Sequence, residues 1–123
     1  MEWSRRLQPR AKVWLEVEGR LVFGAGTAAL LKGIQEYGSL SRAAEELHMS
    51  YRGAWGILRK VERRLGVPLV SSRVGGEEGG GTALTQAGEE LLVRFLQLQA
   101  QVEALTEGIF KGLFDAELSA DGS

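Results

Sequence analysis

The segment at residues 38–65 constrains the fold of this chain more than any other part of the sequence. It reads GSLSRAAEELHMSYRGAWGILRKVERRL, a pattern typical of two helices joined by a tight turn. Ser39 or Ser41 is expected to cap the first helix and Ser50 the second, because serine oxygens accept hydrogen bonds from the free N–H groups of a first helical turn. The turn falls at residues 48–49, and the segment therefore predicts a helix-turn-helix.

The second of these helices, residues 51–65, has one apolar side and one basic side. Its apolar positions are spaced four, three and four residues apart, so they form a single stripe that is expected to be buried. They are Ala54, Leu58, Val61 and Leu65. Gly66 and Pro68 end the helix. The basic residues are Arg52, Arg59, Lys60, Arg63 and Arg64. A helix of this size and charge fits the major groove of DNA, although the net charge of the whole chain is only −1.

The candidates for DNA contact come mainly from the start of that helix, since those residues of a recognition helix point deepest into the groove. They are Ser50, Tyr51, Arg52, Trp55, Arg59 and Lys60. Arg52 can bind a guanine through two hydrogen bonds, and such a pair discriminates against the wrong base by ~1–3 kcal/mol. Arg59 and Lys60 either contact phosphates or simply solvate the helix. Trp55 lies off the apolar stripe, and two interpretations stay open: it borders the DNA face, or it folds against the wing or the first helix.

A glycine-rich hairpin is expected directly after the recognition helix. Residues 69–73 form a short strand, 75–81 a loop and 82–85 a return strand, which together make the wing of a winged helix. The loop lacks the Lys-Ser/Thr ending of a phosphate-binding P-loop, so a flexible wing tip is the favoured interpretation. Arg73, at the base of the wing, is predicted to contact phosphate or the minor groove.

The N-terminal region predicts a β-hairpin at residues 12–24, because apolar and polar residues alternate there. The residues expected to face inward are Val13, Leu15 and Val17. Trp14 then lies on the other side, where an outward Trp indicates contact with another element or with a second copy of the chain. A helix capped by Thr27 and ending at Tyr37 follows the hairpin.

A long helix is predicted at residues 86–112, with Thr85 as its cap. Its apolar positions repeat at spacings of four, three, four, three and four, which is a heptad seam. They are Leu91, Phe95, Leu98, Val102, Leu105 and Ile109. A seam over roughly five turns is longer than one small domain needs, so we expect a dimer interface. The alternative is that this helix simply covers the chain's own core.

Composition excludes several classes of function. The 123 residues suffice for one domain, and the absence of cysteine removes disulfides, thiolate zinc sites and cysteine nucleophiles. No apolar run approaches the ~20 residues that span a membrane, and no apolar segment of a secretory signal follows Arg5 and Arg6. His48 is the only histidine, and no cluster has metal-ligand spacing. We therefore expect a cytoplasmic protein that is not an enzyme and holds no cofactor or metal.

Several of these motifs resemble the N-terminal DNA-binding domain of ModE-type, molybdate-responsive transcription regulators. The most specific is SYRGAW at residues 50–55, and the glycine run at 79–81 and the LTQAG sequence at 84–88 add to it. The GVPL sequence at 66–69 is similar to LysR-type regulators, which share the winged arrangement. The resemblance covers about residues 12–112.

The resemblance implies a winged helix that dimerises through its N-terminal region and its long last helix. It also implies a DNA-reading segment, with Arg73 at the wing, and the residues of that segment are Ser50, Tyr51, Arg52 and Trp55. Full-length members of that family carry C-terminal oxyanion-binding domains, and nothing in these 123 residues supplies a molybdate pocket. We expect a single domain without an oxyanion-binding domain, whose DNA binding is unliganded or controlled by a separate effector-binding protein.

The sequence thus predicts a mainly α-helical chain with a small β content: a winged helix-turn-helix with an N-terminal β-hairpin and a long C-terminal dimerisation helix. The function it favours is a homodimeric, sequence-specific transcription regulator that binds double-stranded DNA at a pseudo-palindromic site, with half-sites about one helical turn (~34 Å) apart or a multiple of it. A protein-interaction module without DNA binding is the alternative, and an oxyanion-binding protein is a third. Acids at Glu45, Glu46 and Glu77 flanking the Arg52 face would favour the alternative.

Overall fold

The computed structural model describes residues 2–76 and 79–122, with side chains described for residues 2–72 and 81–115. Its internal contacts divide the chain into two units. The larger unit is Trp14–Leu96, and the smaller unit combines Met1–Val13 with Gln97–Ser123. The helix-turn-helix, the wing and the N-terminal hairpin all belong to the larger unit.

The N-terminal hairpin is shorter than predicted. Strand β1 (Leu15–Val17) pairs antiparallel with β2 (Arg20–Phe23) across a two-residue turn. Glu18 and Gly19 both have positive φ, 52° and 78°. Positive φ at both central residues is what a type I′ turn requires, and this turn matches the right-handed twist of the paired strands. The backbone geometry of this turn therefore sets where the hairpin reverses.

The buried side of the hairpin differs from the prediction. Val22 and Phe23 in β2 are buried, whereas Val17 is exposed and does not face inward. A register shift lies opposite Leu15 and Glu16, where β2 carries one extra residue, Val22, and the neighbouring residues Val22 and Phe23 are both buried. Trp14 is 47% exposed, as expected, and its indole N–H donates to the Glu16 carboxylate at 2.7 Å.

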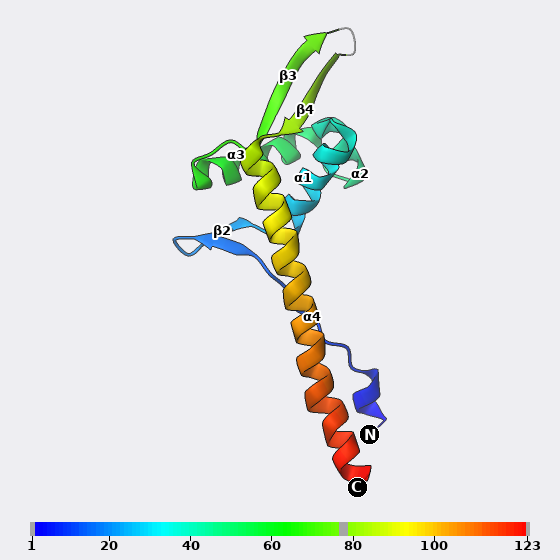
Figure 1. The fold of residues 1–123 in the computed structure, drawn as a ribbon. Coiled ribbons are helices and arrows are strands. Elements are labelled where there is room, and N and C mark those ends of the chain that lie inside the picture. The colour runs from blue at the N-terminus through cyan, green and yellow to red at the C-terminus, as the bar shows by residue number, and fades with distance from the viewer. Residues whose placement is uncertain (1, 77–78, 123) are drawn as a thin grey trace. The chain divides into compact units, whose positions relative to one another are not determined.

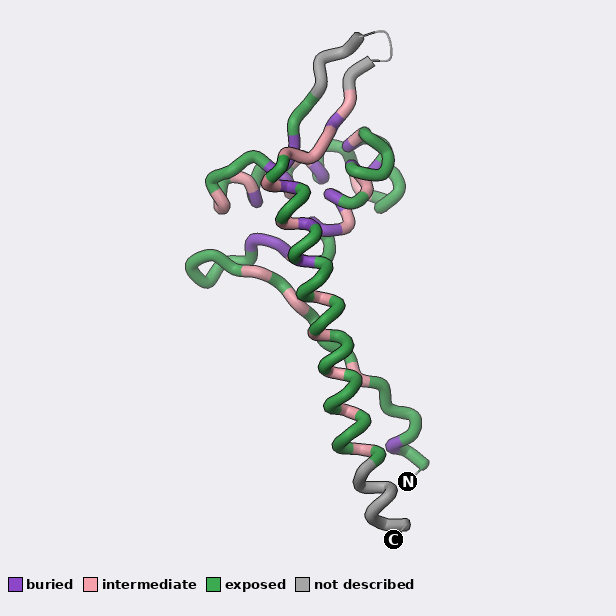
Figure 2. The backbone as a smooth tube through the Cα atoms, viewed as in Figure 1, coloured by how far each residue is buried: buried purple, intermediate pink, exposed green. Residues whose placement is uncertain are grey.

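Three helices form the core of the larger unit: α1 (Ala25–Tyr37), α2 (Leu40–Glu46) and α3 (Tyr51–Leu65) (Figure 1). Helix α1 begins earlier than predicted, with Gly24 as its N-cap. Thr27 is buried on the inner side of α1, so the prediction that it caps the helix was wrong. Buried segments of all three helices converge in this core (Figure 2).

Helices α1 and α2 cross closely because small residues meet at the crossing. A Cβ atom placed on Gly33 of α1 would lie only 2.8 Å from the Cβ of Ala43 in α2. Gly38 ends α1 with φ of 67°, a left-handed conformation that glycine adopts without strain. The short distance between the two helices therefore depends on the absence of a side chain at position 33.

The predicted caps of α2 and α3 are present in the structure. Of the two serines left open for α2, Ser39 is the cap, and its side chain accepts the N–H of Arg42 at 3.1 Å. Ser50 caps α3 by accepting the N–H of Gly53 at 2.9 Å. His48 lies in the turn between the two helices with φ of 57°, in the left-handed region.

The wing consists of β3 (Val70–Gly76) and β4 (Gly79–Leu84), paired antiparallel (Figure 1). Both strands extend further into the glycine-rich segment than predicted, because ladder hydrogen bonds use backbone groups that glycine also supplies. The N–H of Thr82 donates to the carbonyl of Gly38 at 3.0 Å. The Thr82 hydroxyl oxygen also accepts the N–H of Leu40 at 3.4 Å, so the wing is joined to the start of α2.

The last helix, α4 (Gln86–Gly122), is longer than the predicted 86–112. Its first turns belong to the core of the larger unit, where Leu92 and Phe95 are buried. The rings of Phe95 and Phe23 meet edge to face, with centroids 5.0 Å apart. The assignment of Phe95 to a dimer seam is therefore corrected: its side chain is already inside its own chain, and has no surface left for a second copy.

In the smaller unit, an N-terminal segment lies beside the second half of α4 (Figure 1). It contains the 3₁₀ helix η1 (Trp3–Arg6), and residues 8–11 line a hollow together with residues from 103–107. The remaining seam residues of this part of α4 are exposed or half-buried (Figure 2). They are Leu98, Val102, Leu105 and Ile109. Within the described part of the chain, no helix has both the length and the hydropathy to cross a membrane.

Candidate nucleic-acid interface

Helix α3 presents a basic stripe opposite its buried side. Ala54, Leu58 and Val61 are buried, as the sequence predicted, and Leu65, the fourth residue of the predicted stripe, is half-buried. An α-helix turns by about 100° per residue, so residues spaced four, three and four apart on the other side form a second line. These residues, which we call the basic stripe, are Arg52, Gly56, Arg59 and Arg63, and all four are exposed. Lys60 is exposed beside them.

Two charged residues of α3 are used for internal contacts and do not belong to this stripe. Glu62 accepts the backbone N–H groups of Leu69 at 2.7 Å and Val70 at 3.2 Å, where the wing begins. Arg64 donates to the carbonyl of Leu21 in the N-terminal hairpin. Because the Glu62 carboxylate is bound to the wing backbone, the single acid of α3 is held on the flank of the helix, away from the arginines of the basic stripe.

Tyr51, Trp55 and Arg59 form a column of contacts along α3. The indole N–H of Trp55 donates to the Tyr51 hydroxyl oxygen at 2.6 Å, and the two rings meet nearly perpendicularly with centroids 6.4 Å apart. The Arg59 guanidinium carbon lies 5.1 Å from the centroid of the Trp55 ring, within the range of a cation–π contact. Trp55 therefore borders the exposed face and is held by neighbours on its own helix. This favours the interpretation that it borders the DNA face over the interpretation that it folds against the wing or the first helix.

The other residues predicted to contact DNA differ in how exposed or engaged their side chains are. Arg52 and Lys60 are exposed on α3. The Ser50 oxygen is engaged as the helix cap, so this side chain holds the first turn of α3 in place. Arg73 stands in β3 opposite Gly81, and its side chain lies outside the described residues.

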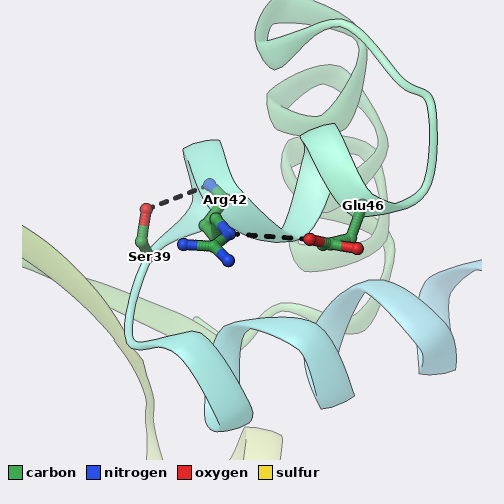
Figure 3. A network of polar contacts seen from close by, with 3 residues as sticks. All are labelled: Ser39, Arg42 and Glu46. Carbon is green, nitrogen blue, oxygen red and sulfur yellow. Dashed lines mark hydrogen bonds and ion pairs between the residues drawn. The ribbon is translucent and has the colours of Figure 1, made fainter.

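Arg42 is an exposed cation near the motif that the sequence prediction missed. Its guanidinium carbon lies 5.2 Å from the centroid of the Tyr37 ring, and its Nε lies 3.6 Å from a carboxylate oxygen of Glu46 (Figure 3). The i, i+4 spacing of Arg42 and Glu46 was a visible signal of this pair. Glu46 is therefore partly neutralised by Arg42, while Glu77, another acid whose position mattered for the DNA face, lies outside the described residues.

The segment that builds this interface matches a known family. The sequence profile of the bacterial regulatory helix-turn-helix proteins of the lysR family matches residues 28–89, about half of the chain. The chain belongs to this family. The matched region of this LysR-family chain includes α2, α3 and the wing, and nearly all of α1.

Curated relatives of this LysR-family chain include molybdenum-related proteins. It is 39% identical over 90 residues to the molybdenum-pterin-binding protein MopB of Rhodobacter capsulatus, covering 73% of this chain and 33% of MopB. It is also 39% identical over 92 residues to the transcriptional regulator ModE of Haemophilus influenzae, covering 75% of this chain and 34% of that protein. The chain thus spans about a third of the length of these relatives, and the resemblance to ModE-type regulators is confirmed for this part.

Two solved structures share the fold of this LysR-family chain. The crystal structure of the CbnR DBD–DNA complex matches with a TM-score of 0.53 and 24% identity, covering 68% of this chain and 94% of that chain. The BenM DBD in its complex with benA site 1 DNA matches with a TM-score of 0.54 and 19% identity, covering 71% and 96%. The predicted fold class, a winged helix-turn-helix with small β content and a long last helix, is confirmed.

Proposed function

We propose that this chain binds double-stranded DNA and regulates transcription in the cytoplasm, with α3 in the major groove. The observation that carries the proposal is that the exposed side of α3, opposite its buried side, carries three arginines of the basic stripe. The acid of this helix, Glu62, is turned toward the wing backbone. Such a face attracts a polyanion even on a chain of net charge −1. Membership of a regulatory helix-turn-helix family supports the same proposal.

We further propose that two copies bind together. The support is an apolar seam on α4, where Leu98, Leu105 and Ile109 are exposed at heptad spacing. A twofold dimer would bind half-sites about one helical turn (~34 Å) apart, or a multiple of it. The name of MopB refers to molybdenum, and the matched parts are only 33% of MopB and 34% of the Haemophilus ModE. We therefore propose that any molybdenum-dependent control of this chain acts through a separate effector-binding protein or segment.

The proposal is tested by fluorescence anisotropy with two duplexes of equal length. One is a fragment recovered by genomic footprinting of the intact protein, and the other is its scrambled sequence. We expect tight binding at low salt and a steep loss of affinity as salt rises, because phosphate contacts release counterions. If a folded chain binds neither duplex at low salt, DNA binding is the wrong function, and a protein-interaction module becomes the better proposal.

Replacing Arg52 with alanine is expected to relax base preference. An exposed arginine near the start of a recognition helix can bind a guanine through two hydrogen bonds, so its loss should reduce discrimination between the two duplexes by ~1–3 kcal/mol. Arg94→Ala is the matched control, because it removes the same charge from an exposed position on α4. An unchanged ratio of affinities in Arg52→Ala would show that this residue does not read bases.

Replacing Gly56 with alanine is expected to strengthen the fold and weaken DNA binding. A Cβ at this mid-helix position would meet nothing within 4 Å, and alanine favours a helix over glycine by about 0.8–1 kcal/mol. A glycine in the middle of the basic stripe instead allows a close approach of the helix backbone to DNA. Gly26→Ala in α1, also open within 4 Å, is the control. Unchanged affinity in Gly56→Ala would remove this position from the interface.

A further inference from the structure

The column of Tyr51, Trp55 and Arg59 leaves the Tyr51 hydroxyl as an oriented hydrogen-bond donor. The indole N–H is a donor only, so the 2.6 Å contact occupies a lone pair of the Tyr51 oxygen. The hydroxyl hydrogen remains available, and Tyr51 is 53% exposed. A DNA backbone offers phosphate oxygens, which are acceptors, so the polarity that Trp55 imposes on Tyr51 matches this partner.

The same tryptophan also positions the arginine at the other end of the column. The guanidinium of Arg59 lies over the indole ring at 5.1 Å, and the ion pairs among the described side chains involve other cations, Arg42 and Lys111. A guanidinium held against an aromatic ring loses less conformational freedom on binding, while its N–H groups remain able to contact a phosphate. Trp55 therefore orients both the Tyr51 hydroxyl and the Arg59 guanidinium.

The place of the column on α3 favours phosphates over base edges for Tyr51. At about 100° per residue, Tyr51 and Trp55 lie on the flank of the helix that also carries Glu62, whereas Arg52 and Gly56 lie near the middle of the exposed face. In a groove, the middle of the face meets the base edges and the flank meets the phosphate backbone.

We infer that Trp55 is a positioning residue that fixes the Tyr51 hydroxyl and the Arg59 guanidinium for binding to DNA phosphates. This inference rests on the proposed DNA-binding function and assigns separate roles within it. Tyr51 and Arg59 contact DNA, Arg52 reads bases, and Trp55 acts through its two neighbours.

The test compares Tyr51→Phe, Trp55→Phe and the double variant in the full chain, using the footprinted duplex and its scrambled counterpart. Phenylalanine at 55 removes the indole N–H but keeps a ring beneath Arg59. We expect Tyr51→Phe to lower affinity about tenfold on both duplexes, because one hydrogen bond to a charged group is lost. Trp55→Phe should have a smaller effect, and the double variant should be no weaker than Tyr51→Phe alone, since Trp55 acts through Tyr51.

An NMR measurement without DNA separates failure of this inference from failure of the proposed function. The chain has three tryptophans, and the Trp55 indole N–H resonance is the one that disappears in Trp55→Phe. In Tyr51→Phe this resonance should shift and its hydrogen should exchange faster. An unmoved resonance, additive losses in the double variant, or a Tyr51→Phe loss confined to the footprinted duplex would overturn the inference while DNA binding stands. A wild-type chain that binds neither duplex would overturn both.

Arg59→Lys provides a further arm of the same test. Lysine keeps the positive charge but cannot present the planar fork of a guanidinium over the indole. We expect the slope of affinity against salt to stay unchanged while affinity falls several-fold on both duplexes. Affinity equal to that of the wild type would show that stacking on Trp55 does not position the Arg59 side chain for DNA binding.

Discussion

Replacing Phe95 with alanine is expected to lower the free energy of unfolding by about 3–5 kcal/mol. The side chain is 1% exposed, and its ring packs edge to face on Phe23, with centroids 5.0 Å apart. Truncation removes the buried apolar surface, leaves a cavity that the neighbouring helices cannot fully close, and ends an aromatic contact. The measurement is urea denaturation followed by circular dichroism at a fixed protein concentration.

Val93→Ala is the control for this experiment. Val93 lies two residues away on the same helix but is 51% exposed, so its truncation should change stability by less than about 1 kcal/mol. If Phe95→Ala is as stable as this control, and instead shifts the chain from dimer to monomer in sedimentation, the original assignment of Phe95 to the seam between two copies would be restored.

Replacing Gly88 with alanine is expected to destabilise the fold by about 3 kcal/mol, the upper end of what overpacking usually costs. A Cβ on Gly88 would lie 2.2 Å from the carbonyl oxygen of Leu69, so the backbone of α4 or of the segment before the wing has to move. That carbonyl also accepts the N–H of Thr85 at 2.9 Å, and the Thr85 hydroxyl donates to the carbonyl of Pro68 at 2.7 Å. A shift therefore disturbs the contacts that join the start of α4 to the wing.

Gly56→Ala is the matched control for Gly88→Ala. Both replace a helical glycine with alanine, but only position 88 has a backbone atom in the way. Thermal and urea unfolding should place the two variants on opposite sides of the wild type. If Gly88→Ala also gains stability, the close approach of α4 to Leu69 is not a constraint on the fold.

The helix-turn-helix was predictable because its signals are local. Ser50 followed by the Ala54, Leu58 and Val61 spacing defines the start of α3 and its buried side, and the structure confirms both. The sequence also predicted Gly66 as the end of this helix, where φ is 77°. The candidate DNA face followed from the same spacing, because residues off the apolar stripe of a surface helix face outward.

Other features depended on contacts that the local pattern does not contain. Apolar spacing alone could not assign Phe95 to the core, since a heptad seam and a core-facing stripe look alike over a few turns. The extra residue of β2, Val22, lets Val22 and Phe23 both be buried, and only the pairing of the two strands reveals it. Likewise, the Glu62 carboxylate meets the N–H groups of Leu69 and Val70 only because the chain reverses direction after α3.

The order of residues by itself determined where α3 begins and ends, and which of its sides is apolar and which is basic, because capping and periodicity act within a few neighbouring residues. Tertiary structure decided which of the charged and aromatic side chains stay available to DNA. It engages Glu62 and Arg64 internally, buries Phe95 and leaves Arg52 open, because burial and pairing depend on how α3 lies against the wing and the N-terminal hairpin, and on how α4 lies against that hairpin.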